Sequence, residues 1–299
     1  MTGTIDKVAV IGSGVMGAGI AAHCANAGCE VLLLDIVQEE SQDRSSVARN
    51  AIKMMHKANP EMLMHKRNAK RITPGNIEDD LHLLKDYDWV VEVIIENLEI
   101  KRNLYSKLSD YIGSNTILSS NTSTIPRSEL VSELPEDISS RFLITHFFNP
   151  PRYLPLLEVV TSSEVNDDVV SRFCNFADRR LGKRVTMCND RPGFIGNRLG
   201  VYFVQRAIKA TLEHGLSVEQ ADAMLGRPIG LPKTGVFALM DLIGIDLIPK
   251  VGQSLQSRLD EEDPFHKITG PGEDIIMSMI EEGYTCLLYT SPSPRDTAI

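Results

Sequence analysis

The chain has 299 residues, of which 42% are apolar and 24% charged, and its formal net charge is −9. These values are typical of a globular protein of about two domains, and they exclude collagen-like, disordered and disulfide-rich chains. The acidic balance argues against a nucleic-acid partner, because such a protein needs a basic face to neutralise phosphates.

The amino-terminal segment has the pattern of a strand, a glycine turn and a helix. Residues 7–11 are a β-branched run that ends in the motif GSGVMG, and residues 15–27 are small and apolar. In a GxGxxG turn the glycines permit the tight turn, the approach of a pyrophosphate and close packing of the helix. We therefore expect a dinucleotide phosphate site at Gly12, Gly14, Val15, Met16 and Gly17.

Asp35 lies at the carboxyl end of the next apolar run, residues 30–36, where a ribose-binding acid is expected. A carboxylate accepts hydrogen bonds from both ribose hydroxyls and repels the 2′-phosphate of NADP, so it favours NAD as cofactor. The alternative, a structural turn beside a surface aspartate, fits less well because the motif stands between a strand and a helix.

Strands and helices continue to alternate along the first two thirds of the chain. We expect strands at 89–95, 116–119 and 142–148, and helices near 97–112 and 126–134. Residues 38–71 are polar and expected to be helical, with a break at Asn59-Pro60. They include a basic cluster, which we interpret as a solvated helical face, at Lys66, Arg67, Lys70 and Arg71. This alternation predicts a Rossmann-type, doubly wound, mostly parallel α/β sheet.

The pattern changes at Arg191-Pro192-Gly193, after a last β-rich run at 183–188. Helical segments follow at 194–214, 218–225, 235–258 and 273–282. We expect a Rossmann domain over residues 1–190 and an all-α domain over 191–285. Residues 286–299 turn to Ser-Pro repetition and look like a translated sequencing or cloning remnant, with an ordinary tail as the alternative.

No metal site, secretion signal or membrane span is expected. No apolar run approaches the roughly 20 residues needed to cross a bilayer. The cysteines form no CxxC pair and lie in or beside apolar runs, which favours free thiols in the cytoplasm; they are Cys24, Cys29, Cys174, Cys188 and Cys286.

His146 in THFFNP and Glu158 in LLEVV stand among apolar neighbours. A buried carboxylate must be paired or neutralised, and an imidazole is one available partner. Such a pair would fix one tautomer of the histidine and raise its basicity, which is the arrangement of a general base and its orienting group. The alternative is that His146 is a structural histidine at a strand end.

Two polar segments follow predicted strands and so belong at the sheet edge where ligands bind. Residues 119–124 (SSNTST) either project hydroxyls and an amide toward a ligand or cap the next helix through Ser123 or Thr124, and both interpretations stay open. Glu92 and Glu96 end another strand, and one of them is expected to pair with Lys101 as the structural alternative to a binding role.

With these residues assembled, the chain resembles the 3-hydroxyacyl-CoA dehydrogenases of fatty-acid β-oxidation from about residue 6 to about residue 284. The motifs that carry the resemblance occur in the family's order: GSGVMGAGIA, VVEVIIENLEIK, SSNTS, THFFNPP, LLEVV, GK at 182–183 and RPGFIGNR. The resemblance implies that His146 is the catalytic base and Glu158 its partner. It also implies that Ser123 and Asn197 touch the reacting oxygen region of the substrate, and that NAD is held with the help of Asp35, Glu96, Lys101, Ser123 and Asn149.

The implied reaction is the NAD-dependent oxidation of an L-3-hydroxyacyl-CoA to a 3-ketoacyl-CoA, with the helical domain binding substrate and pairing two copies into a homodimer. Two alternatives remain: a dehydrogenase of a small hydroxy acid without CoA, and a nucleotide-binding structural protein with a silent site.

Three features depart from the short enzymes of that family. Their CoA-contacting serine and lysine correspond here to Ala51 and Ala58, with Lys53 and Lys57 nearby. The segment HFFNPPRYLPLLEVV and the insert at 66–71 more closely resemble long multi-domain dehydrogenases in which a hydratase-like domain follows, so we expect an amino-terminal fragment. The Ser-Pro tail replaces the family's glycine- and lysine-rich continuation, which predicts weakened cofactor closure and reduced activity.

Overall fold

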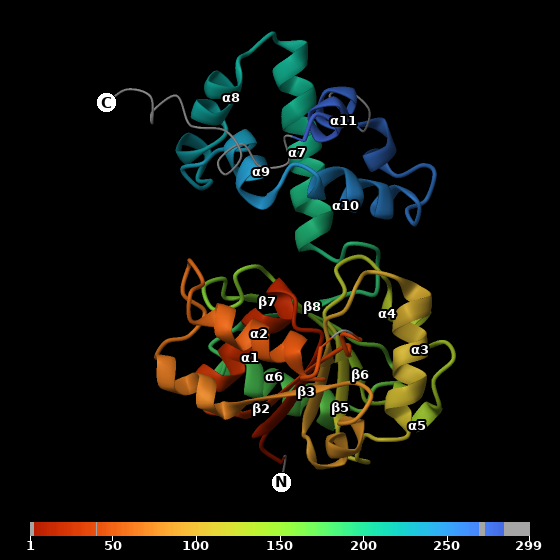
Figure 1. Ribbon diagram of the computed structural model, residues 1–299. Helices are drawn as coiled ribbons and strands as arrows, with labels where there is room; N and C mark the ends of the chain where they lie inside the picture. The colour runs from red at the N-terminus through yellow and green to blue at the C-terminus, as the bar shows by residue number, and fades with distance from the viewer. Residues whose placement is uncertain (1–2, 40, 269–272, 284–299) are drawn as a thin grey trace. The chain divides into compact units, whose positions relative to one another are not determined.

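The computed structural model describes residues 3–39, 41–268 and 273–283. The chain divides after Phe194 into two compact units, a few residues beyond the boundary expected from the sequence (Figure 1). The first unit is a sheet flanked by helices and the second is helical, so the predicted fold class is confirmed.

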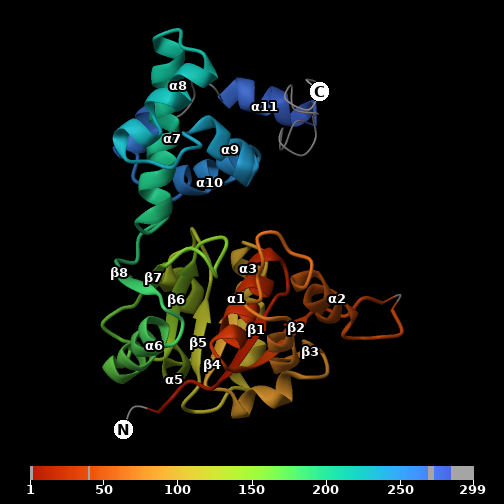
Figure 2. The same cartoon turned by 90° about the vertical axis from the view of Figure 1, so that its left-hand side faces the viewer.

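Eight strands form one sheet in the described part of the first unit. They are β1 (Lys7–Ile11), β2 (Glu30–Asp35), β3 (Ile72–Asn76), β4 (Trp89–Glu92), β5 (Ile117–Ser120), β6 (Phe142–Phe147), β7 (Leu156–Val160) and β8 (Arg184–Cys188). Their spatial order is β3-β2-β1-β4-β5-β6-β7-β8, which Figure 2 shows across the sheet. Every neighbouring pair is parallel except β6 and β7. The order reverses between β1 and β4, and ligands bind at the carboxyl ends of strands at such a switch point.

Helices cover both faces of this sheet. They are α1 (Val15–Asn26), α2 (Ser46–Met55), α3 (Leu98–Ser109), α4 (Arg127–Val131), α5 (Glu136–Ser139) and α6 (Asp167–Arg179), with 3-10 turns η1 (Lys66–Arg71) and η2 (Leu81–Asp86). Alternate residues of β1 face opposite layers: Val8 and Val10 pack with α1, α2 and α6, whereas Ala9 and Ile11 pack with α3, α4 and α5. Figure 1 shows α3, α4 and α5 together on one side.

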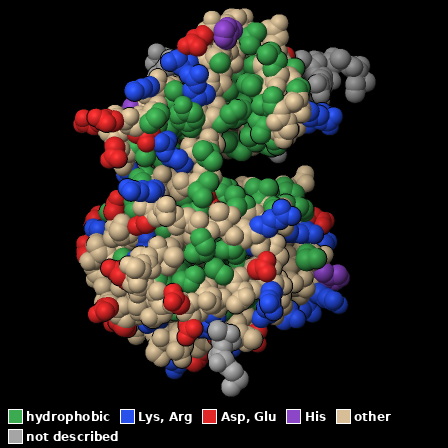
Figure 3. All heavy atoms as spheres, turned by 180° about the vertical axis from the view of Figure 1, so that it is seen from behind, with side chains coloured by type: hydrophobic (Ala, Val, Ile, Leu, Met, Phe, Trp, Pro, Cys, Tyr) green, Lys and Arg blue, Asp and Glu red, His purple; other side chains and the backbone are tan. Residues whose placement is uncertain are grey.

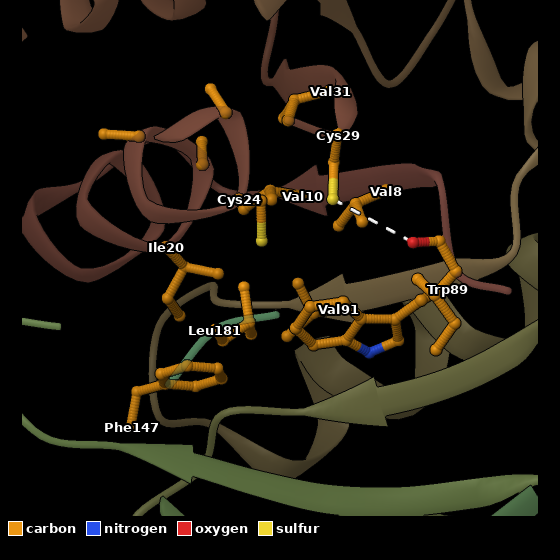
Figure 4. Packing of buried hydrophobic residues seen from close by; sticks show 14 of the residues in the cluster. Val8, Val10, Ile20, Cys24, Cys29, Val31, Trp89, Val91, Phe147 and Leu181 are labelled. Atoms are coloured by element: carbon orange, nitrogen blue, oxygen red, sulfur yellow. Dashed lines mark hydrogen bonds between the residues drawn. The ribbon is translucent and has the colours of Figure 1, made fainter. Parts of the chain in front are cut away.

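Trp89 anchors the layer on the α1 and α6 side. The side chain is fully buried, its indole N–H donates to the Ser119 Oγ at 2.8 Å, and the Phe173 ring lies edge-on at 5.1 Å. Figure 4 shows Trp89 and Phe147 in one packed group with Cys24 of α1. Truncating a buried aromatic of this size costs about 3–5 kcal/mol of unfolding free energy, so this group is a main source of the unit's stability.

The structure corrects the prediction that residues 38–71 are helical. Among the described residues of this range only α2 is an α-helix, and the basic cluster lies on the 3-10 turn η1 with its side chains exposed, as expected of a solvated face. Figure 3 shows Lys and Arg side chains gathered on the surface of this unit. The edge strand β3 was not predicted, because its sequence ITPGN holds a proline and a glycine that are depleted in strands. The predicted strand 89–95 also ends early, at Glu92.

The second unit is built from α7 (Gly196–Glu213), α8 (Val218–Met224), α9 (Phe237–Ile243), α10 (Leu247–Gln256) and α11 (Glu273–Glu281), with 3-10 turns η3 (Arg227–Ile229) and η4 (Pro264–Lys267). Val204, Ala207 and Ile208 of α7 supply a buried stripe at helical spacing. The helix predicted over 235–258 is broken at Gly244, whose φ of 94° belongs to the left-handed region that favours glycine. In the described part of the chain no helix has the length and apolarity to cross a membrane. The Ser-Pro tail lies outside the described residues.

Candidate active site

His146 and Glu158 form a buried pair. The register of β6 and β7 sets the two residues directly opposite each other, and the Nδ1 of His146 lies 2.7 Å from the Oε2 of Glu158. The side chains are 7% and 1% exposed. Because a carboxylate only accepts hydrogen bonds, we assign the proton to Nδ1, which leaves the Nε2 lone pair available as a base. The arrangement can therefore take a proton from a ligand and stabilise the resulting imidazolium.

Aromatic rings and an amide hold this histidine in place. The ring centroids of Phe148 and Phe194 lie 4.5 and 5.9 Å from that of His146 and shield it from water. The backbone N–H of Phe147 donates to the Oδ1 of Asn121 at 2.9 Å, which ties the loop after β5 to the strand that carries His146. Asn121 belongs to the SSNTS motif, which the sequence placed at the ligand-binding edge of the sheet, but its bond to Phe147 is a contact that the sequence did not reveal.

The glycine turn leads directly from β1 into α1. Gly12 has a φ of 101°, and a Cβ there would lie 2.5 Å from the carbonyl oxygen of Val93. A Cβ on Gly17 would collide with the carbonyl oxygen of Gly12, so the helix can approach the turn only with glycine there. A Cβ on Gly14 would meet nothing within 4 Å. The outer side of the turn is therefore open to a phosphate at the amino end of α1.

Asp35 is held by the turn itself. Its Oδ2 accepts hydrogen bonds from the backbone N–H and the hydroxyl of Ser13, both at 2.6 Å. Its Oδ1 accepts from the N–H of Ile36 at 2.7 Å. A carboxylate has about four acceptor positions, so one remains for a ligand hydroxyl. Asp35 therefore stands at the end of β2 with its carboxylate aimed by the glycine turn and with an acceptor position open to a ribose hydroxyl.

A cavity of about 520 Å³ lies beside this aspartate. Gly12, Gly14 and Asp35 border it, and its apolar walls include Ile36, Ile77, Leu81, Ile94, Ile95 and Ile100. Ile36 and Ile95 are 59% and 64% exposed, as expected where a flat apolar ring would complete the packing. The cavity and the open turn therefore fit the adenosine and pyrophosphate of a dinucleotide. The sequence signal for this cavity is that apolar residues continue past the carboxyl ends of β2 and β4.

Glu96 binds the loop that follows β5 through several hydrogen bonds. Its Oε1 accepts from the Thr122 Oγ1 at 2.6 Å and from the backbone N–H groups of Ser123 and Thr124 at 3.0 and 3.1 Å. Burial alone would raise the pKa of Glu96, but the charge of Lys101 and these hydrogen bonds outweigh it and lower the pKa. The N–H of Ile125 donates to the Thr122 Oγ1 at 3.1 Å, which closes a turn before α4. The helix itself begins after Pro126, and the N–H groups of Arg127 and Ser128 donate to the Asp190 carboxylate at 2.6 and 2.9 Å, so the expected cap from Ser123 or Thr124 is wrong.

Lys101 turns inward from α3. Its ammonium lies 2.6 Å from the Oε1 of Glu92 and 3.4 Å from the Oε2 of Glu96, and its side chain is 1% exposed. The expectation that a glutamate pairs with this lysine is confirmed. An effect of Lys101 on a cofactor would therefore pass through Glu96.

Asn149 and Val15 border one small cavity, of about 160 Å³, together with Ala58. The loop after Asn149 is fixed by the buried Lys183, which donates to the carbonyl oxygens of Pro151 and, at 2.7 Å, Leu154. Burial lowers the pKa of Lys183 to about 8. Met16 packs against the core cluster behind the glycine turn. Asn197 belongs to the first turn of α7, in the second unit.

A Rossmann unit that carries this glycine turn, an acidic residue at the end of β2 and a buried histidine–glutamate pair defines a nucleotide-dependent dehydrogenase. Residues 7–191 match the family model of the 3-hydroxyacyl-CoA dehydrogenase NAD binding domain, and residues 193–283 match the model of the C-terminal domain. The chain belongs to the 3-hydroxyacyl-CoA dehydrogenase family, and its cofactor is NAD.

Relatives of known name agree with this family. The chain is 44% identical over 268 residues to a Rickettsia felis protein named as a fatty acid oxidation complex trifunctional enzyme, covering 90% of this chain and 37% of the relative. It is 43% identical over 261 residues to a Deinococcus radiodurans protein named as a 3-hydroxyacyl-CoA dehydrogenase, covering 87% and 75%. The crystal structure of the 3-hydroxybutyryl-CoA dehydrogenase of Escherichia coli K12 matches with a TM-score of 0.80 at 31% identity, covering 95% of this chain and 58% of that one. The chain thus spans 37% of the trifunctional relative's length.

Proposed function

We propose that this chain oxidises an L-3-hydroxyacyl-CoA to the 3-ketoacyl-CoA with NAD, as the dehydrogenase part of a fatty-acid oxidation enzyme. The observation that carries the proposal is the hydrogen bond of 2.7 Å between His146 and Glu158, buried in a chain of this family. The names of the relatives in Deinococcus radiodurans and Escherichia coli supply the substrate class.

In this proposal the Nε2 of His146 takes the proton of the 3-hydroxyl group. Glu158 keeps the ring in the productive tautomer and stabilises the imidazolium that forms. NAD, when bound, supplies the two-electron oxidant for C3 of the substrate. In the reverse direction His146 returns the proton to the 3-keto oxygen. Ser123 and Asn197 act as donors to that oxygen, where negative charge develops in the transition state.

The remaining site residues hold the cofactor. The turn residues Gly12, Gly14, Val15, Met16 and Gly17 receive the pyrophosphate, and Asp35 receives the adenosine ribose. Glu96, Lys101, Ser123 and Asn149 support the nicotinamide end. The support for this assignment is the open turn, the cavity beside Asp35, and the hydrogen bonds that place the loop of Ser123 on Glu96.

The test is a substrate panel followed by NADH absorbance, with acetoacetyl-CoA compared against free hydroxy acids and their keto forms. We expect turnover with the CoA thioester, and loss of turnover but not of NADH binding in His146→Gln. Turnover of free acids alone would favour a dehydrogenase that does not need CoA. NADH binding without turnover of any compound would favour a silent nucleotide-binding protein.

The chain is further proposed to belong to a longer enzyme that carries a hydratase-like domain and pairs into a homodimer through its helical unit. The name of the trifunctional relative, of which the chain covers 37%, supports the larger enzyme. A cytoplasmic location is supported by four free cysteines among the described residues: Cys24, Cys29, Cys174 and Cys188. Size-exclusion chromatography with light scattering tests the pairing.

A further inference from the structure

We propose that Glu92 is a positioning residue, which holds the loop of Ser123 in the geometry that the reaction needs. The proposal rests on the proposed function and deepens it. Glu92 ends β4, next to the switch point of the sheet, yet its side chain is fully buried and touches neither cavity of the site. A role for Glu92 must therefore pass through its neighbours.

The carboxylate of Glu92 is fully occupied by four donors. Its Oε1 accepts from the Lys101 Nζ at 2.6 Å and from the N–H of Ile94 at 2.7 Å. Its Oε2 accepts from the Tyr105 hydroxyl at 2.5 Å and from the Ser120 Oγ at 2.7 Å. Because an ionised carboxylate offers about four acceptor positions, this cluster has one arrangement and no spare partner.

One path from Glu92 to the loop runs through the backbone after β5. The Oγ of Ser120 accepts from the N–H of Thr122 at 3.1 Å, and the carbonyl oxygen of Glu92 accepts from the N–H of Asn121 at 2.8 Å. These bonds fix the two residues that precede Ser123.

The second path from Glu92 to the loop runs through the ion pairs of Lys101. Lys101 bridges Glu92 and Glu96, and Glu96 in turn bonds the backbone N–H of Ser123. A buried lysine held between two carboxylates keeps the second one aimed at the loop. Glu92 therefore holds the loop through Ser120 and Lys101, whereas Glu96 bonds the loop directly.

A stability role alone does not explain this cluster. A buried ion pair contributes little net stability compared with apolar residues of the same volume, because both charges lose their hydration. The opposite end of β4 supplies a comparison: Asp88 precedes Trp89 and bonds Arg172 at 2.8 Å and the N–H groups of Asp6 and Lys7 at 2.9 and 3.0 Å. Asp88 is thus a structural carboxylate at the sheet edge away from the site, and Asp88→Asn is the matched control.

The kinetic test compares Glu92→Gln with Asp88→Asn. In Glu92→Gln an amide NH2 replaces an acceptor oxygen and faces donors, so the loop should shift and kcat for acetoacetyl-CoA should fall roughly 10- to 100-fold. The KM for NADH should change by a smaller factor than kcat, because the glycine turn and the cavity beside Asp35 do not include Glu92. Asp88→Asn should keep kcat within about twofold even if it lowers the melting temperature. If Glu92→Gln fails to fold, Tyr105→Phe replaces it, since that variant removes one donor and no charge.

A double-mutant cycle with Ser123→Ala tests whether Glu92 acts on turnover through Ser123. If Glu92 acts by placing Ser123, the variant Glu92→Gln/Ser123→Ala should be no slower than Ser123→Ala alone. If the fold losses in kcat of the two single variants multiply in the double variant, the proposal is overturned.

Amide hydrogen exchange supplies a measurement that does not depend on turnover. Exchange over residues 121–125 should accelerate roughly tenfold or more in Glu92→Gln and remain unchanged in Asp88→Asn. Unchanged exchange in Glu92→Gln would overturn the positioning role. If the wild-type chain turned over no acyl-CoA, the proposed function would fail, and this exchange comparison would still decide the role of Glu92.

Discussion

His146 and Glu158 face each other across the one antiparallel junction among the described strands, β6 against β7. Directly opposed residues of an antiparallel pair present their side chains on the same face with Cβ atoms about 5 Å apart. The imidazole and the carboxylate therefore reach 2.7 Å without a bend in either strand. Rigid strands hold the pair, so little reorganisation is needed when the imidazole becomes charged.

Replacing His146 by Gln should lower kcat about 10²- to 10⁴-fold, the usual worth of a positioned acid–base group. NADH affinity should stay within about threefold, because the glycine turn and the cavity beside Asp35 do not include His146. Stopped-flow turnover and a fluorescence titration with NADH measure the two effects. A variant that keeps wild-type turnover would exclude His146 as the base.

Replacing Glu158 by Gln should keep the shape of the pair and remove its charge. The amide oxygen can still accept from Nδ1, but it no longer stabilises the imidazolium, so we expect kcat to fall roughly 10- to 10³-fold. Glu136→Gln is the control, since Glu136 is exposed in the first turn of α5. Equal turnover in both variants would show that the charge of Glu158 is not needed.

Replacing Asp35 by Ala should weaken NADH binding roughly 10- to 100-fold, because a charged acceptor of a ribose hydrogen bond is lost. The preference for NADH over NADPH should shrink as well, since the repulsion of a 2′-phosphate disappears. Ser13→Ala removes one of the donors that aim this carboxylate and should give a smaller loss in the same direction. Fluorescence titrations with NADH and NADPH test this, and an unchanged preference in Asp35→Ala would contradict the assignment.

Replacing Gly17 by Ala should lower the free energy of unfolding of the first unit by about 1–3 kcal/mol, the usual cost of overpacking. The added methyl would collide with the carbonyl oxygen of Gly12 and push α1 away from the turn. NADH affinity should fall at the same time. Gly200→Ala in α7 is the control: a Cβ there meets nothing within 4 Å, so stability should rise by up to about 1 kcal/mol. Urea unfolding of both variants measures the difference.

His23 should make the chain less stable in mild acid. Burial, followed by the charge of Lys183, lowers the pKa of His23 from 6.5 to about 4 in the folded state. Between these values the unfolded chain binds a proton that the folded chain does not, so stability is lost as pH falls through 6.5 toward 4. The loss between pH 7 and pH 5 should be roughly 1–2 kcal/mol.

The check on His23 is urea unfolding of the wild type and of His23→Gln at both pH values. In the wild type the Nε2 of His23 lies 2.9 Å from the carbonyl oxygen of Leu181, a bond that the amide of Gln can also donate. The variant should therefore lose less stability on acidification than the wild type does. An identical loss in both proteins would assign the effect to other groups.

The sequence by itself determined the local parts of this protein. The runs at 7–11 and 30–36 gave two buried parallel strands, and the glycine turn between them gave the start of α1, because neighbouring residues set backbone conformation and apolar period. It also named both members of the histidine–glutamate pair. It failed at β3, an edge strand that pairs only with β2 in the described sheet and needs less apolar sequence. It also failed at residues 38–71, because a polar pattern does not distinguish a helical face from turns and loops.

Only the tertiary structure decided which of these parts meet. The contact of His146 with Glu158 depends on the direction of β7. The walls beside Asp35 come from the segments after β2, β3 and β4, from η2 and from α3, which the strand order brings together. Ser13 and Asn121 bond partners more than twenty residues away along the chain. Glu92 joins one such partner, Ser120, to the nearer donors Ile94, Lys101 and Tyr105. Local sequence fixes backbone shape, whereas contacts between distant residues follow from how the strands are ordered and directed, and that depends on packing of the whole unit.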